Sequence, residues 1–119
     1  PYHCFCRKTT RLVAESMNLP EDSYMTTFQS RFGPAEWLQP YTDKTIESLA
    51  KDGTDHIHVI SPAFSSDCLE TIEELNEENR EIFMENGGQK FGYIPCLNDR
   101  DDHILLLTSL LENELHGWV

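Results

Sequence analysis

The chain alternates between segments in which apolar residues recur every three or four positions and segments with the two-residue period of strands. Helical spacing over residues 4–17 predicts a first helix, which ends at Asn18-Leu19-Pro20. Residues 23–29 alternate and are rich in threonine and aromatic side chains, so they predict a strand. Residues 30–41 contain one glycine and two prolines and predict a long loop, of the kind that often carries function.

The same alternation continues to the end of the chain. Thr42 is expected to cap a helix that runs to about Asp52 and ends at Gly53, and residues 56–62 predict a β-branched strand. A third helix is expected to begin at Ser66 or Asp67, followed by a strand over residues 90–96 and a helix over about 101–115. The expected buried residues of these two helices are Leu69, Ile72, Leu75, Ile82 and Phe83, and Ile104, Leu105, Leu107, Leu110 and Leu111.

Strands that alternate with helices predict an α/β fold, with a parallel sheet between layers of helices in a single domain over residues 1–119. Three strands are few for a parallel sheet, and the chain begins at Pro1 without a methionine, so we expect a piece of something longer. Ligands of such sheets bind beyond the carboxyl ends of the strands. The loops that carry Trp37 and Glu70 follow the first two strands, and both residues are expected to face one cleft.

Composition narrows the classes of function. A formal net charge of −12 and a pI near 4.6 disfavour binding to nucleic acid or anionic membranes through bulk charge. No apolar run approaches the roughly 18 residues of a membrane-spanning helix. The four cysteines lack CxxC spacing, which favours reduced structural thiols in a cytoplasmic protein. The alternative is an iron–sulfur or zinc site that uses Cys4 and Cys6.

The third predicted helix carries a row of glutamates on one side. At about 100° per residue they fall within roughly a quarter to a third of its circumference. Like charges recur four residues apart, and we expect a cation or a proton to offset their repulsion. Carboxylates are suitable ligands for Fe²⁺, Mg²⁺ or Ca²⁺, and they also share protons. The alternative is a solvated helix face. The row consists of Glu70, Glu74, Glu77, Glu78, Glu81 and Glu85, of which Glu81 and Glu85 are expected to be plain surface.

Aromatic residues and histidines offer further candidates. Trp37 can form a flat wall for a planar ligand, assisted by Phe32 and Tyr41, or it can be a partly buried packing residue. His56 and His58 share one face of a strand, where satisfied histidines are more common than metal ligands. No GxSxG, P-loop or GxGxxG motif occurs, so serine hydrolysis and nucleotide binding lack support.

Three long runs resemble the C-terminal part of bacterial ferrochelatase, of the proteobacterial type, over essentially the whole chain. They are TFQSRFGPAEWLQPYTDKTIESLAKDG, HIHVISPAFSSDCLETIEELNEENREIF and GGQKFGYIPCLND. The signatures FQSRFGxxxWLxPYT and PxFxxDCLETxEEL are long and specific. The resemblance implies a chelatase-type, Rossmann-like three-layer α/β/α fold that is an incomplete half of a two-domain enzyme. It also implies insertion of Fe²⁺ into protoporphyrin IX, the last step of haem biosynthesis.

The resemblance also implies roles for individual residues. Glu70 matches the active-site carboxylate that binds iron or removes a proton. Glu74 and Glu78 match the acidic row behind it, on a helix with a π-type irregularity, as a metal or proton path. Trp37 matches an aromatic residue near the porphyrin. Cys68 stands where other branches of the family carry histidine, which puts a ligand role for it in doubt.

One departure from the family pattern affects the expected activity. The family's SxHG-like motif with its catalytic histidine is absent from this sequence, so the chain alone is expected to be inactive. The resemblance implies protoporphyrin IX and ferrous iron as substrates. It assigns no resident cofactor and leaves open whether the whole enzyme carries an iron–sulfur cluster. It also allows peripheral membrane association of the whole enzyme. The rival hypotheses are a chelatase for another divalent metal and a non-enzymatic acidic α/β interaction module.

Overall fold

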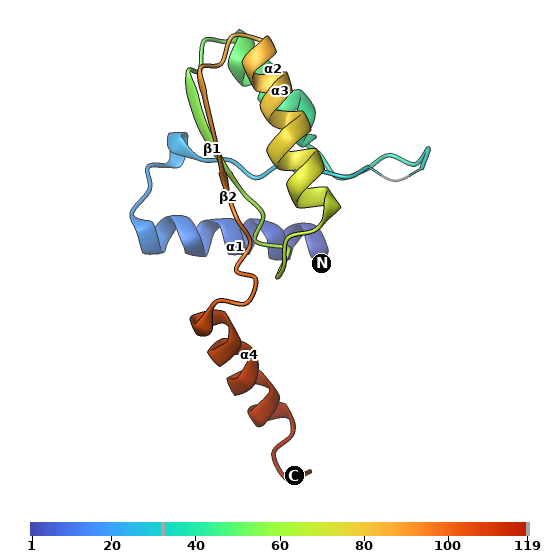
Figure 1. The fold of residues 1–119 in the computed structure, drawn as a ribbon, viewed down its shortest axis with the longest axis vertical. Helices are drawn as coiled ribbons and strands as arrows, with labels where there is room; N and C mark the ends of the chain where they lie inside the picture. Colours follow the sequence, from blue (N-terminus) through green and yellow to red (C-terminus); the bar gives the residue numbers. More distant parts are fainter. Residues whose placement is uncertain (32, 119) are drawn as a thin grey trace.

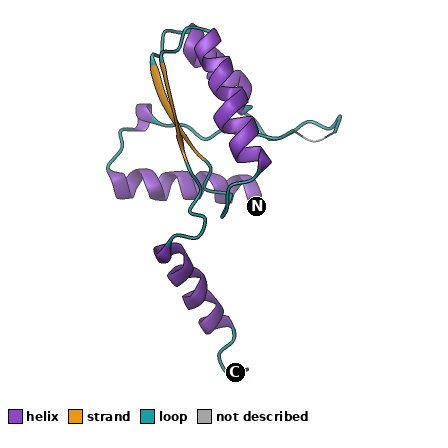
Figure 2. Ribbon diagram, in the orientation of Figure 1, coloured by secondary structure: helices purple, strands orange, loops and turns teal. Residues whose placement is uncertain are grey.

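Helices and strands alternate along the chain, as the sequence predicts. The structure is a computed structural model that describes residues 1–31 and 33–118. Figures 1 and 2 show the arrangement of its helices and strands. In order they are α1 (Tyr2–Met17), a 3₁₀ turn η1 (Glu21–Ser23), α2 (Thr42–Lys51), β1 (His56–Ile60), a π-helix η2 (Glu70–Glu78), α3 (Asn79–Glu85), β2 (Lys90–Ile94) and α4 (Asp101–Glu114).

The two strands form a parallel pair, in register from His56 opposite Lys90 to Ile60 opposite Ile94. The connection between them is the crossover through η2 and α3, so the α/β class with a parallel sheet is confirmed. Side chains of β1 alternate between half-buried and exposed, which places His56, His58 and Ile60 on an open face. The sheet is therefore an incomplete part of the layered fold that the alternation predicts.

The strand expected over residues 23–29 is wrong. This segment begins with η1 and then runs extended, and its only ladder contact among the described residues is the bridge between Phe28 and Tyr41. The threonine hydroxyls bond to helices instead: Thr26 donates to Thr10 at 2.8 Å, and Thr27 accepts from Thr42 at 2.9 Å. A period-two pattern forms a strand only where a neighbouring backbone can pair with it.

Helices α2 and α3 cover the other face of the sheet and enclose the core (Figure 1). Ile46 and Ala50 from α2 meet Phe83 from α3 and Phe91 from β2, with the Phe rings 6.1 Å apart. The chain turns beneath this contact at Gly88, where an added Cβ would clash with the Phe83 ring. Only glycine fits that close approach, so the glycine pair both ends α3 and admits the core phenylalanine.

Helix α2 differs in detail from the prediction. Thr42 is its first helical residue and not its N-cap, because the Thr42 hydroxyl bonds to Thr27 and Tyr41 precedes the helix. Helices α1 and α4 begin and end close to their predicted limits, and the left-handed Asn18 ends α1.

The buried face expected of α4 is wrong. All five of its predicted core residues are 40–67% exposed, and His103 is the buried residue of the helix. Figure 1 shows the reason: α4 projects away from the sheet toward the C-terminus, and no described element packs along it. A helix that is apolar around most of its surface is normally covered, but its sequence does not say by what. Within residues 1–31 and 33–118, no helix is long and apolar enough to cross a membrane.

Candidate functional site

The acidic helix opens as a π-helix over Glu70–Glu78 before it continues as α3. At its end the Asn79 amide N–H bonds to the carbonyl of Glu74, five residues back, and the Asn79 side chain donates to the same carbonyl at 2.9 Å. Such i→i+5 turns are uncommon and often occur at functional sites. The irregularity implied by the resemblance is confirmed.

The wider turns change which residues face the core. Thr71 and Asn79 are buried, at 0% and 2% exposure, whereas Leu69 is 73% exposed and Ile72 is 48% exposed. The prediction that Leu69 and Ile72 pack on the sheet is therefore wrong, because it assumed 3.6 residues per turn throughout. Leu75 and Phe83 are buried, as predicted.

Glu74 is the member of the glutamate row that the structure holds in place. Its carboxylate accepts from Ser30 twice: from the backbone N–H at 2.8 Å and from the hydroxyl at 2.5 Å. Glu70 is exposed, and its carbonyl accepts from the Gln29 amide at 2.8 Å. A hydrogen bond from the Cys68 thiol, with a smaller contribution from its own backbone N–H, lowers the pKa of the Glu70 carboxyl.

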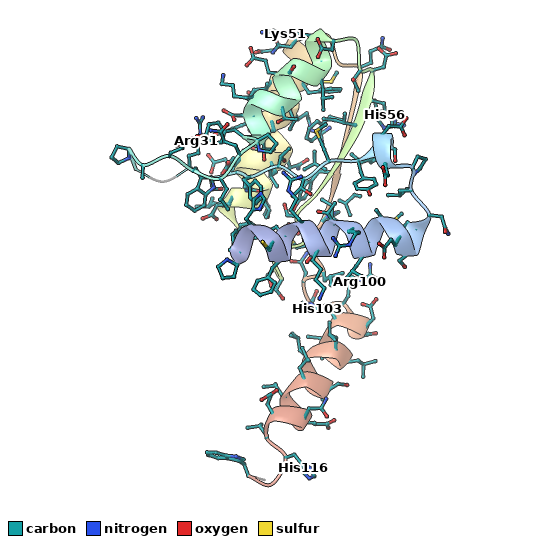
Figure 3. All side chains as sticks on the ribbon, turned by 180° about the vertical axis from the view of Figure 1, so that it is seen from behind. Arg31, Lys51, His56, Arg100, His103 and His116 are labelled. Carbon is teal, nitrogen blue, oxygen red and sulfur yellow. The ribbon has the colours of Figure 1, made fainter. Side chains whose placement is uncertain are left out.

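An acidic groove of about 310 Å³ lies beside the row. Glu74 and Glu78 line one wall, and Arg31 and Asp43 line another, where they form an ion pair at 3.0 Å. The Arg31 guanidinium also lies 4.4 Å from the centre of the Tyr41 ring, and Figure 3 shows it at the start of the projecting loop. The remaining wall residues are Phe28, Ser30, Asn79 and Ile82.

A second, apolar groove of about 180 Å³ contains Trp37, which is 38% exposed and available to a ligand. Phe28 and Ser30 line both grooves, so the two are adjacent. Trp37 and the glutamate row therefore lie on neighbouring grooves, although Glu70 itself lines neither. Tyr41 lies under Arg31, outside the apolar groove, and Phe32 falls outside the described residues. The other lining residues are Tyr2, Gln29, Ile60, Ser61, Pro62, Ala63 and Phe64.

Sequence reasoning missed the hub that anchors the start of the π-helix. The Asp67 carboxylate accepts from Tyr93 at 2.6 Å, from the Asn98 amide at 2.8 Å and from Thr71 at 2.9 Å. These bonds, led by the one from Tyr93, hold the pKa of Asp67 far below its usual range. Burial, together with the bond to Asp67, raises the pKa of Tyr93. An aspartate four residues before a threonine at a helix start was the available signal, and it was interpreted only as a cap.

A buried histidine fixes the same loop from the other side. His103 meets the Asn98 carbonyl at 2.6 Å through Nδ1 and the Ser65 hydroxyl at 3.0 Å through Nε2. It lies at the start of α4 (Figure 3), and no sequence motif marked it. The strand β2, the loop before η2 and the first turn of α4 are thereby joined just ahead of Glu70.

No preformed metal cage accompanies these contacts. Across the part of the chain that the structure describes, no three His, Cys, Asp or Glu side chains gather closely enough to hold a metal ion. The rings of His56 and His58 lie 4.6 Å apart on the exposed strand face. The four cysteines are free thiols, and Cys96 is the buried one. Metal binding by Glu70, Glu74 and Glu78 together stays a prediction.

Known proteins match the chain along its whole length. The family model described as ferrochelatase matches residues 1–115. The ferrochelatase of Marinobacter nauticus is 62% identical over 118 residues, which cover 99% of this chain and 32% of that protein. The ferrochelatase of Rhizobium etli is 57% identical over 119 residues, which cover 35% of that protein. The ferrochelatase of Hydrogenovibrio crunogenus is 58% identical over 118 residues, which cover 31% of that protein. The chain therefore spans about a third of the length of these curated relatives.

Proposed function

The chain belongs to the ferrochelatase family, and from this premise we propose that it forms the C-terminal, chelatase-type α/β domain of an enzyme of haem biosynthesis. The proposed reaction is the insertion of ferrous iron into protoporphyrin IX, in which both are substrates. One observation of the structure carries the proposal: an apolar groove with an accessible tryptophan adjoins a groove lined by carboxylates. A planar apolar ligand and a divalent cation would each find a suitable surface, side by side.

The apolar groove suits one part of the macrocycle. Trp37 and Phe64 supply flat apolar walls, and Phe28 closes the side that faces the acidic groove. A tetrapyrrole is larger than 180 Å³, so this groove would contact part of the ring and leave the rest to other surfaces. A rigid aromatic wall can hold the ring in the bent shape that directs pyrrole nitrogens toward an incoming metal.

The glutamate row suits the second substrate. We assign Glu70 to the ring, at the start of the row, and Glu74 and Glu78 to the transfer of iron or protons behind it. The Glu70 side chain is exposed, so its carboxylate oxygens are accessible to replace water around Fe²⁺ or to accept a ring proton.

The proposal places only part of the active site on this chain. Residues 1–119 cover about a third of the relatives' length, and the described residues offer no closed metal site. We therefore propose that the chain alone does not turn over. Detectable metalation of protoporphyrin by residues 1–119 in isolation would contradict this part of the proposal.

A chimera tests the assignment of Glu70. The chain would replace the matched third of the Marinobacter nauticus enzyme, with and without Glu70→Gln, and iron insertion would be followed by porphyrin absorbance. The variant should lower kcat by at least about 100-fold and change the KM for porphyrin little, because the substitution removes a group that acts on the metal or proton. Glu85→Gln, an exposed change on α3, should leave both constants near those of the parent chimera. An unaffected kcat in Glu70→Gln would refute the assignment.

A further inference from the structure

We propose that Ser30 is a positioning residue that fixes the Glu74 carboxylate and links its placement to the occupancy of the apolar groove. This inference rests on the proposed function of the two grooves. Ser30 is the first residue of the loop 30–41 that carries Trp37, directly after the extended residues 24–29. It is half-buried, and it lines the apolar groove and the acidic groove alike.

The contact between the two residues is a clamp with two donors. The Ser30 N–H points to Oε1 of Glu74 at 2.8 Å, and its hydroxyl points to Oε2 at 2.5 Å, so both carboxylate oxygens are held. Hydrogen bonds to an ionised acceptor are short and strong. Ser30 makes them from a left-handed backbone conformation, with φ of +57°, which a non-glycine residue adopts rarely. A residue that keeps an unfavourable φ in order to place two donors is a candidate for function.

No other described side chain holds the Glu74 carboxylate in place. Within residues 1–31 and 33–118, Ser30 is the only residue whose donors reach the Glu74 carboxylate. Two nearby side chains on the same helix do not donate to the Glu74 carboxylate: Glu78 carries the same charge, and the Asn79 amide donates to the Glu74 carbonyl. Arg31 is engaged by Asp43. The orientation of Glu74 therefore depends on Ser30.

The link to the apolar groove passes through Gln29, which lines that groove beside Ser30. Its amide donates to the Ser30 hydroxyl at 3.2 Å and, more closely, to the Glu70 carbonyl at 2.8 Å. Two adjacent residues thus hold two successive turns of the π-helix. Gln29 and Ser30 both line the apolar groove, and no described glutamate does, so a ligand in that groove contacts the residues that hold the π-helix. A shift of Ser30 would move Glu74 with it, because both Glu74 oxygens are bonded to Ser30.

Three substitutions in the chimeric enzyme separate positioning from general stability. Ser30→Gly keeps the backbone N–H and the positive φ but removes the hydroxyl, and kcat should fall about tenfold while the KM for porphyrin changes less than about threefold. Ser30→Asn should recover most of kcat, because asparagine tolerates the left-handed region and offers a side-chain N–H. The matched control is Ser48→Ala, which removes an exposed hydroxyl on α2, outside both grooves, and should have no effect.

A double-mutant cycle tests the partnership directly. If Ser30 acts through Glu74, Ser30→Gly should cost little further activity in a Glu74→Gln background. Fully multiplicative losses in an active chimera would overturn the inference and leave the proposed function standing. A parent chimera that fails to metalate porphyrin would instead count against the proposed function.

The clamp is also testable without turnover, in the 119-residue chain. The Ser30 amide proton should resonate downfield because it faces a carboxylate, and Glu74→Gln should move it strongly, whereas Glu85→Gln should not. If Glu74→Gln leaves the chemical shift of the Ser30 amide proton unchanged, the clamp is refuted, regardless of the activity of the chimera.

Discussion

Replacement of Asp67 by asparagine should destabilise the chain strongly, because the Asp67 carboxylate is the acceptor for three side chains. Tyr93 and Thr71 donate to Oδ1, and the Asn98 amide donates to Oδ2. The Asn98 side-chain amide cannot rotate to present its oxygen to residue 67, because its Oδ1 already accepts a hydrogen bond from the Asp67 backbone N–H at 2.8 Å, and rotation would break that bond. In Asp67→Asn an NH₂ group therefore takes the place of Oδ2 and faces the donor of Asn98.

The magnitude follows from the bonds lost. A hydrogen bond to a charged group contributes about 1.5–3 kcal/mol, and a neutral one about half as much. Asp67→Asn removes the bond from Asn98 outright and makes the bonds from Tyr93 and Thr71 neutral. The free energy of unfolding should fall by about 3 kcal/mol, a large share of the roughly 5–15 kcal/mol typical of a domain. With an m-value of about 1.5 kcal/mol/M, the urea midpoint should fall by roughly 2 M.

The effect should depend on pH in one direction. The folded-state pKa of Asp67 lies below its unfolded value of about 3.9, so its stabilisation is fully present above that pH and is lost as the pH falls through the folded pKa. Urea unfolding of the two proteins, followed by circular dichroism, should differ by a constant amount from pH 7 down to about pH 5, and the difference should shrink progressively as the pH falls below about 4. Asp99→Asn makes the same change at an exposed position and should shift the midpoint little. Equal midpoints for Asp67→Asn and the parent at pH 7, or a gap that persists unchanged in acid, would refute the reasoning.

Two further predictions concern single groups at the site. The buried Ser61 hydroxyl has no hydrogen-bond partner among residues 1–31 and 33–118, so Ser61→Ala should raise the free energy of unfolding by about 1 kcal/mol in thermal melts. A clear loss of stability would show that the hydroxyl is satisfied. The Cys68 thiol is the main cause of the lowered pKa of Glu70, so Cys68→Ala should move that pKa up toward the ordinary value. A carbon-13 titration of the Glu70 carboxyl measures the change, and an unchanged titration curve would exclude the thiol as the cause.

The interpretation of Glu70, Glu74 and Glu78 shows how far a site can be inferred from sequence. Their spacing placed them in one row, and the resemblance implied a π-type irregularity. The structure adds that the three are held differently, since Ser30 clamps Glu74 while the side chain of Glu70 is exposed. The clamp joins residues 44 positions apart, and no local pattern encodes a contact at that separation. The hub at Asp67 was missed partly for this reason, because its donors Tyr93 and Asn98 lie 26 and 31 positions away, although Thr71 is only four residues away.

Local patterns determined the elements whose stability is local. Helical spacing that stops at Asn18-Leu19-Pro20 predicts α1, the β-branched run from His56 predicts β1, and residues 90–96 predict β2, because these preferences are set by neighbouring residues. The family signatures are also local features, because they consist of residues close together in the sequence.

Tertiary structure decided which segments pair as strands and which side chains are buried, because both depend on a second surface that contacts the first. The threonine-rich segment 23–29 has strand composition, but among the described residues it pairs only at Phe28. The leucines of α4 have core composition, but no described element covers them. The π-helix turned Thr71 inward in place of Ile72, because its phase is set by backbone bonds across five residues and not by the apolar pattern. Burial and pairing are properties of two surfaces, and the sequence of one segment specifies only one of them.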